Sequence, residues 1–209
     1  MRTDIRAKRD AHRWFAVLAP LIDALDRHLR RRLQVTEYSS SPDCLFRLQL
    51  IVNDEEFLLE DGTLVRAGER LVDLHFWNEH VPLIPDGRPT LAYARRIERC
   101  LDVSLSELAH HLASHDDLSD VKAIRGNMSL GASRRSEQLA RMAAKYGFET
   151  LAQKKPLSAG ETLHRFGENI LVTFLVMRRN PSAIRADTLW RDRTLVYLSR
   201  QTLERKFGA

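Results

Sequence analysis

The stretch VKAIRGNMSLGASRRSEQLARMAAKYGF, residues 121–148, shows the clearest succession of elements in this chain. It reads as a short strand, a polar loop bounded by glycines, an amphipathic helix capped by Ser133, and a return to a second strand near Phe148. A loop that joins a strand to a helix directs several backbone N–H groups to one point, and the helix dipole there favours negative charge. The stretch therefore predicts a site for an anionic ligand, such as the phosphate of a cofactor.

The predicted ligand-binding residues are the basic, polar and glycine residues of this loop. They are Arg125, Gly126, Asn127, Ser129, Gly131, Arg134 and Arg135. The loop is not a P-loop, because it lacks the Gly-Lys-Ser/Thr ending, and it does not match GxGxxG. The structural alternative is an ordinary strand–helix connection with an exposed pair of arginines.

Upstream of this unit, the pattern changes to short strands. Residues 46–52 alternate between apolar and polar side chains, which is typical of a half-buried strand. Asp61-Gly62 stands between residues 57–60 and 63–66 and is a strong signal for a two-residue hairpin turn. With a further strand at residues 71–78, three or four consecutive antiparallel strands are expected.

The remaining patterns are helical, apart from a strand at residues 194–198 that precedes a short helix capped by Ser199. Residues 4–33 form an amphipathic helical region, and residues 158–177 a further helix. A helical pair is expected between the strands, and Ser104 would cap its second member in a capping box with Glu107. Because helices separate only the later strands, the order predicts an α+β fold. We expect a helical region at 1–33 and one domain at 40–209 with a central mixed sheet, antiparallel N-terminal strands and flanking helices.

Composition limits the functional classes. The longest apolar run, residues 170–177, is far shorter than the roughly 20 residues of a membrane-spanning helix. No signal peptide is recognisable at the start, and the two cysteines lie in apolar surroundings, so we expect free thiols in a cytoplasmic protein. Aromatic residues make up only 7% and no nucleic-acid-binding module is recognisable, so no nucleic acid partner is expected.

Charge is concentrated at the two ends of the chain. Residues 1–33 carry nine basic and four acidic residues, and residues 178–209 carry eight and three, whereas the whole chain has a net charge of only +5. The central part is therefore acidic. Basic ends predict contact with an anionic membrane surface or an acidic protein, and hence a peripheral location at the inner membrane. A helix packed on the domain with a solvated basic face is the alternative for residues 1–33.

The LHFWNEH segment, residues 74–80, has an unusual density of polar side chains at the end of a strand. Asp73 and His75 share one face of that strand, so the carboxylate could fix the tautomer of the imidazole or raise its basicity. We therefore predict His75 as a base, with Asp73 as its partner and Asn78 as a hydrogen-bonding group. No metal is expected, because the histidines at 110, 111 and 115 are better explained as a solvated helix end than as an HExxH site.

Several short motifs occur in a recognisable order. They are a Gly-acid turn before a Leu-His-x-x-Asn strand (Gly68, Glu69, Leu74, His75, Asn78), a strand ending Gly-x-x-x-Leu (residues 126–130), a Gly-Phe pair (Gly147, Phe148) and a closing Leu-Ser-x-x-x-Leu (Leu198, Ser199, Leu203). Over residues 40–206 this pattern resembles the YkoP-like domain, a bacterial family. The resemblance implies a role linked to cell-envelope glycan or lipid synthesis. Residues 120–152 also resemble the GNAT acyltransferase fold, in which a similar loop holds the pyrophosphate of coenzyme A.

Two functions of different classes follow as expectations. The first is a transferase-like protein of cell-envelope lipid or glycan synthesis that binds a phosphate-bearing small molecule, of acyl-CoA or nucleotide-sugar type. The second is a non-catalytic binding or scaffold protein that docks a membrane-associated biosynthetic enzyme through its basic ends. No motif in the sequence decides whether the protein is an enzyme.

Overall fold

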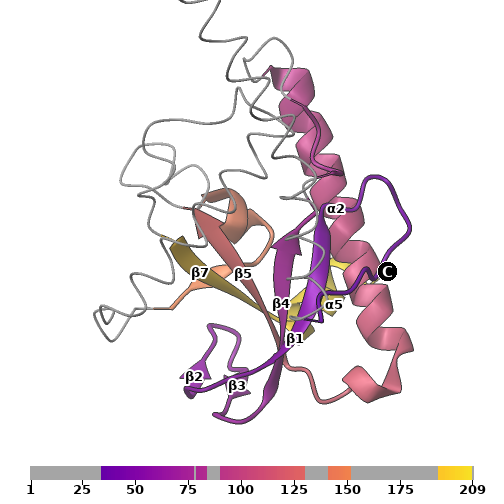
Figure 1. Ribbon diagram of the computed structural model, residues 1–209. Helices are drawn as coiled ribbons and strands as arrows, with labels where there is room; N and C mark the ends of the chain where they lie inside the picture. Colours follow the sequence, from indigo (N-terminus) through magenta and orange to yellow (C-terminus); the bar gives the residue numbers. More distant parts are fainter. Residues whose placement is uncertain (1–33, 78, 84–89, 130–140, 152–192, 209) are drawn as a thin grey trace, which may run out of the picture.

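The computed structural model describes residues 34–77, 79–83, 90–129, 141–151 and 193–208 (Figure 1). Their centre is a five-stranded sheet with the order β1-β4-β5-β7-β6. Its strands are β1 (Phe46–Val52), β4 (Arg70–Phe76), β5 (Ala123–Ser129), β6 (Glu149–Thr150) and β7 (Arg193–Ser199). Only β4 and β5 pair in parallel, and the other neighbours are antiparallel. The predicted α+β fold with a mixed sheet is confirmed.

The Asp61-Gly62 turn lies in a hairpin, as predicted, but the hairpin is not part of the main sheet. Its strands β2 (Phe57–Leu58) and β3 (Leu64–Val65) pair only with each other and form a small second sheet. Gly62 has a positive φ of 85°, a conformation that glycine adopts without strain. The Glu60 backbone N–H donates to the Glu149 carboxylate, and the Ser199 hydroxyl donates to the Asp61 carboxylate. These bonds hold the turn against the main sheet.

One continuous helix, α2 (Leu91–Ser114), replaces the predicted helical pair. Ser104 does not cap a helix but lies inside α2, fully buried. Its hydroxyl donates to the Cys100 carbonyl oxygen at 2.5 Å and accepts from the Leu45 backbone N–H at 2.8 Å. A polar residue in a helix thus bonds to a distant segment, and the local capping pattern gave the wrong interpretation.

The chain closes as predicted with β7 and a short helix. Ser199 caps α5 (Arg200–Phe207) by accepting from the Thr202 N–H at 2.9 Å. A 3-10 turn, η2 (Asp116–Leu118), connects α2 to β5. Among the described residues, none of the helices combines the length and hydropathy required to cross a bilayer. The predicted helices at 4–33 and 158–177 lie outside the described residues.

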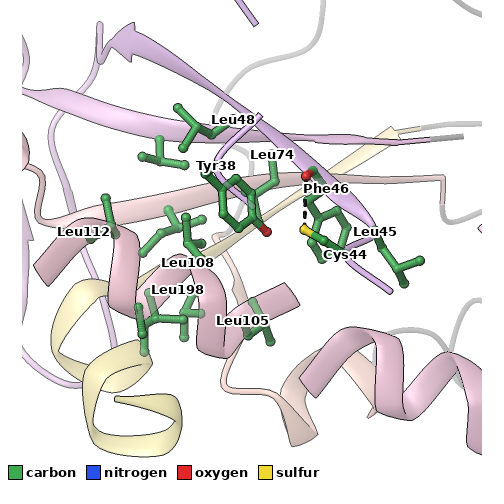
Figure 2. Close-up of a cluster of buried hydrophobic side chains, with 14 of the residues drawn as sticks. Tyr38, Cys44, Leu45, Phe46, Leu48, Leu74, Leu105, Leu108, Leu112 and Leu198 are labelled. Atoms are coloured by element: carbon green, nitrogen blue, oxygen red, sulfur yellow. Dashed lines mark hydrogen bonds between the residues drawn. The ribbon is translucent and has the colours of Figure 1, made fainter. Parts of the chain in front are cut away.

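The main core lies between the sheet and the two helices α2 and α5. Leucines of α2 pack on β1, β4 and β7, and the ring of Tyr38 lies among them (Figure 2). The Tyr38 hydroxyl donates to the Ser104 carbonyl oxygen at 3.0 Å. Cys44 and Cys100 are free, buried thiols, as expected. This face of the sheet is therefore committed to packing.

Among the described residues, the β2–β3 hairpin covers part of the opposite face of the sheet, called here the second face. Leu59 and Val65 of the hairpin pack on Leu71 of β4 and Ala123 of β5 and form a smaller core. Beyond this apolar cluster, the same face carries polar side chains. These polar residues include Asp73, His75 and Arg125, which were predicted from the sequence as site residues.

Candidate functional site

A row of polar side chains crosses all five strands of the sheet at one level of the second face. The strand register places Gln49 of β1 opposite Asp73 of β4, Asp73 beside Arg125 of β5, Arg125 opposite Tyr197 of β7, and Tyr197 opposite Glu149 of β6. Directly paired residues on adjacent strands project on the same face and their side chains are neighbours. We call these five residues the polar row.

The strongest contact in the polar row joins Asp73 and Arg125. The guanidinium Nε lies 2.8 Å from Oδ1 and Nη2 lies 2.9 Å from Oδ2, which is the two-bond geometry of a strong arginine–carboxylate pair. The Asp73 side chain is 11% exposed and that of Arg125 is 27% exposed. Burial by itself would lower the pKa of Arg125, but the bond to Asp73 outweighs it and the pKa is raised. Arg125 is therefore a fixed cation.

His75 lies at the next level of β4 and touches two members of the polar row. Its Nε2 is 2.9 Å from Gln49 Oε1 and 3.5 Å from Asp73 Oδ2. Both partners are acceptors, so Nε2 carries the proton in the neutral ring, and Nδ1 is then the basic nitrogen. The structure thus brings the predicted Asp73, His75 and Arg125 together, with Gln49 as a further orienting group.

The far side of the polar row consists of Tyr197 and Glu149. Burial raises the pKa of the Tyr197 hydroxyl, and the positive charge of Arg125 partly opposes this. Burial also raises the pKa of Glu149, whose carboxylate accepts from the Glu60 backbone N–H at 2.9 and 3.1 Å. Glu149 therefore has a structural partner in the hairpin turn, whereas Tyr197 keeps a protonated hydroxyl beside the Asp73–Arg125 pair.

Of the remaining predicted ligand-binding residues, Gly126, Asn127 and Ser129 lie on β5 and not in a loop. β5 extends to Ser129, so the residues from Arg125 to Ser129 are strand, and the predicted loop can begin only after them. Gly126 faces the helix-covered side, where an added Cβ would lie 3.3 Å from Val196 Cγ2. Asn127 is exposed on β5, two residues beyond Arg125. The predicted residues Asn78, Gly131, Arg134 and Arg135 lie outside the described residues.

Sequence reasoning missed Gln49, Tyr197 and Glu149 as members of the site. A signal for Gln49 was present, because it alternates with apolar residues along β1 in the same way that Asp73 does along β4. The strand order and register bring Tyr197 beside Arg125, 72 positions away in the chain, and have no local signature in the sequence.

The histidine group at the end of α2 is a separate feature. The rings of His111 and His115 lie 4.1 Å apart, and His115 Nδ1 lies 2.8 Å from the His111 carbonyl oxygen. Burial and the neighbouring His115 lower the pKa of His111. Within the described ranges, no group of three or more histidine, cysteine or acidic residues is arranged to hold a metal ion.

A comparison with known proteins shows which family the chain belongs to. The family model of the YkoP domain matches residues 16–207, which is most of the chain. The chain belongs to the YkoP domain family. No curated protein sequence and no solved structure matches it significantly.

In this YkoP domain, the motif residues divide between packing and the polar site. Leu74, Leu198 and Leu203 are buried in the main core. Gly147 has a φ of +92° and ends the helical residues 141–145, where the Phe148 N–H bonds the Ala143 carbonyl oxygen at 2.9 Å. His75, in contrast, contacts the polar row, and is therefore the described motif residue with a place in the candidate site.

Proposed function

We propose that this YkoP domain is a transferase-like protein that binds a phosphate-bearing small molecule, of acyl-CoA or nucleotide-sugar type, over the polar row, with His75 as base. The observation that carries the proposal is the two-bond Asp73–Arg125 pair with His75 held beside it. The ion pair and the neighbouring His75 hold a guanidinium, a carboxylate and an imidazole in fixed relative positions on one face of the sheet. A role in cell-envelope lipid or glycan synthesis is part of the same proposal.

Arg125 would contact the phosphate through donors that Asp73 does not occupy. The guanidinium has five N–H donors, and the bonds to Asp73 use those of Nε and one of Nη2. Because Asp73 balances the charge of Arg125, affinity would come from directed N–H bonds and not from net charge. The exposed amide of Asn127 lies two residues further along β5 and would supply another donor.

His75 would take the proton from the attacking group of the acceptor. With Nε2 bonded to Gln49 and near Asp73, a proton taken up at Nδ1 gives an imidazolium next to the Asp73 carboxylate. That carboxylate stabilises the cation, and this is how an acid–base histidine is oriented in many enzymes.

Ligand binding measured by calorimetry tests the proposal, with acetyl-CoA and UDP-glucose as probes. We expect saturable binding to the wild type that is lost in Arg125→Gln and retained in Arg66→Gln, a matched change at an exposed arginine. Loss of transfer activity with retained binding is expected for His75→Gln. Binding that is the same in Arg125→Gln as in the wild type would refute the site. Absence of binding by every probe would favour the non-catalytic scaffold.

We also propose a cytoplasmic location with peripheral contact to the inner membrane. The basic excess of residues 1–33 supports it, together with Arg205 and Lys206, which are exposed on α5. Basic residues near an anionic surface contribute about 1 kcal/mol each, and the attraction is screened by salt. We expect salt-sensitive sedimentation with anionic vesicles that is reduced by deleting residues 1–33. Equal sedimentation with neutral vesicles would contradict this proposal.

A further inference from the structure

An open hollow of about 570 Å³ lies between the segment that precedes β1 and the segment that follows β4. Its lining includes Glu37, Ser39, Ser40, Trp77 and His80. The hollow is next to the candidate site, because Arg47, which lies over the Trp77 ring, is the direct strand partner of His75. Sequence reasoning noted the polar density of this segment but did not assign a role to His80.

His80 is held in a defined orientation in this hollow. Its ring stacks on Trp77 at 3.7 Å between centroids and 17° between planes. Its Nδ1 lies 2.9 Å from the Cys44 carbonyl oxygen. A carbonyl oxygen only accepts, so Nδ1 carries the proton, and Nε2 of the neutral ring is an acceptor. A stacked ring with one fixed tautomer loses little freedom when it binds a ligand.

The charges around the hollow disfavour an anion. Among the described residues, the charged groups beside the hollow include the Arg47 guanidinium, which lies 3.1 Å from the Glu37 carboxylate and 3.6 Å from that of Glu79. Both acids are about half exposed. This described set has two carboxylates for one guanidinium and therefore favours a neutral ligand over a phosphate. The lining instead offers a carboxylate, serine hydroxyls and the His80 nitrogen, which are groups that hydrogen-bond hydroxyls.

We propose that the hollow binds a neutral, hydroxyl-rich ligand, a sugar or a similar polyol, whose hydroxyls donate to His80 Nε2 and to the Glu37 carboxylate. The inference rests on the proposed function in one respect: the bound sugar would be the acceptor, placed beside His75 and separate from the phosphate-bearing donor. Sugar binding itself requires no transfer reaction and is tested alone.

Heteronuclear NMR of the histidine side chains of the full chain tests the proposal. The probes are D-glucose, D-galactose and N-acetyl-D-glucosamine. We expect His80 to be the Nδ1–H tautomer and its Nε2 signal to move in a saturable way with at least one sugar. In His80→Asn the amide nitrogen replaces Nδ1 as donor to Cys44, while the Nε2 acceptor is lost, so affinity should fall about tenfold. His110→Asn, at an exposed position of α2, should bind like the wild type.

Glu37→Gln provides a second variant at an exposed position and should also weaken sugar binding. The proposal is overturned if none of the three sugars gives a saturable change up to its solubility, or if both His80→Asn and Glu37→Gln bind as the wild type does. Inorganic phosphate that shifts His80 more than the sugars would also overturn it. Sugar binding by the wild type, together with no binding of either acetyl-CoA or UDP-glucose, would refute the donor site only.

Discussion

Alanine variants of three glycines should separate the cost of backbone strain from the cost of steric crowding in the free energy of unfolding. Gly68 has a φ of +88° and open space where a Cβ would lie. Gly126 has ordinary strand geometry but a prospective Cβ contact of 3.3 Å with Val196. Gly147 combines a φ of +92° with contacts of 2.8 Å to Thr202 and 3.1 Å to Leu198. The three sites therefore test strain alone, crowding alone, and both.

The magnitudes follow from these geometries. A non-glycine residue in the left-handed region costs about 1–2 kcal/mol, and the more restricted unfolded chain returns about 0.4–1 kcal/mol, so Gly68→Ala should destabilise by about 1 kcal/mol. Thr202 and Leu198 are buried, and overpacking against buried side chains adds about 1–3 kcal/mol, so Gly147→Ala should lose about 2–4 kcal/mol of unfolding free energy. Alanine suits a strand better than glycine by about 0.5–1 kcal/mol, which offsets the mild crowding, so Gly126→Ala should stay within about 0.5 kcal/mol of the wild type.

Urea unfolding followed by far-UV circular dichroism gives the free energy of unfolding of each variant. The expected order of destabilisation is Gly147→Ala, then Gly68→Ala, then Gly126→Ala, with unchanged denaturant slopes. A loss at Gly147 no larger than at Gly68 would refute the reasoning, because the contacts with Thr202 and Leu198 would then have no cost. A large loss of unfolding free energy in Gly126→Ala would show that β5 and β7 cannot shift enough to accommodate one methyl group.

Three further outcomes are expected. Ser104→Ala should lower the free energy of unfolding by about 1–3 kcal/mol, because a buried backbone N–H loses its acceptor, whereas Ser106→Ala at an exposed position of α2 should not; urea unfolding compares them. Burial raises the pKa of all four tyrosines, that of Tyr146 to about 12, so near-UV absorbance at pH 10 should show less tyrosinate in the folded protein than in the unfolded chain. The stability gained from keeping these hydroxyls protonated is present below the unfolded pKa and is lost as the pH rises through the folded pKa. Burial alone would raise the pKa of Asp61, but hydrogen bonds from hydroxyl and N–H groups lower it. The stability advantage of the wild type over Asp61→Asn should therefore be present above the ordinary aspartate pKa of 3.8 and disappear as the pH falls through the lower pKa of the folded protein.

Local signals in the sequence predicted the elements whose causes are local. The alternation of β1, the turn at Asp61-Gly62 and the cap at Ser199 all depend on residues within a few positions of one another. The same signals gave the α+β class, because the fold class follows from the order of elements. The hairpin, however, pairs only with itself, and its docking through Glu149 links residues 89 positions apart.

Ser104 shows why the same reasoning failed for α2. A serine followed three residues later by a glutamate is a helix-start signature, and the sequence contains it. The decisive partner of Ser104 is the Leu45 backbone N–H, 59 positions away. This N–H donates to the Ser104 hydroxyl, which lies inside a continuous helix. A hydroxyl that bonds locally and one that bonds a distant strand have the same appearance in a sequence.

The site was predicted in part for a related reason. Strand alternation placed Asp73 and His75 on one face, and they are neighbours at 3.5 Å. Arg125 was assigned to a loop because glycine and polar residues follow it, although β-pairing with β7 carries the strand on to Ser129. Its pairing with Asp73 depends on the parallel register of β4 and β5, which a helix and a turn separate in the chain.

The energetics of the polar row support the proposal that it binds a ligand. A buried ion pair such as Asp73–Arg125 contributes little net stability compared with apolar residues of similar size. The neighbouring level of the same two strands is apolar, with Leu71 and Ala123 packed under the hairpin, so this face accepts an apolar core. All five strands nevertheless place a polar side chain at one level, from segments as distant as Gln49 and Tyr197. We infer that the polar row serves ligand binding and not stability. Calorimetry of Arg125→Gln tests that inference directly.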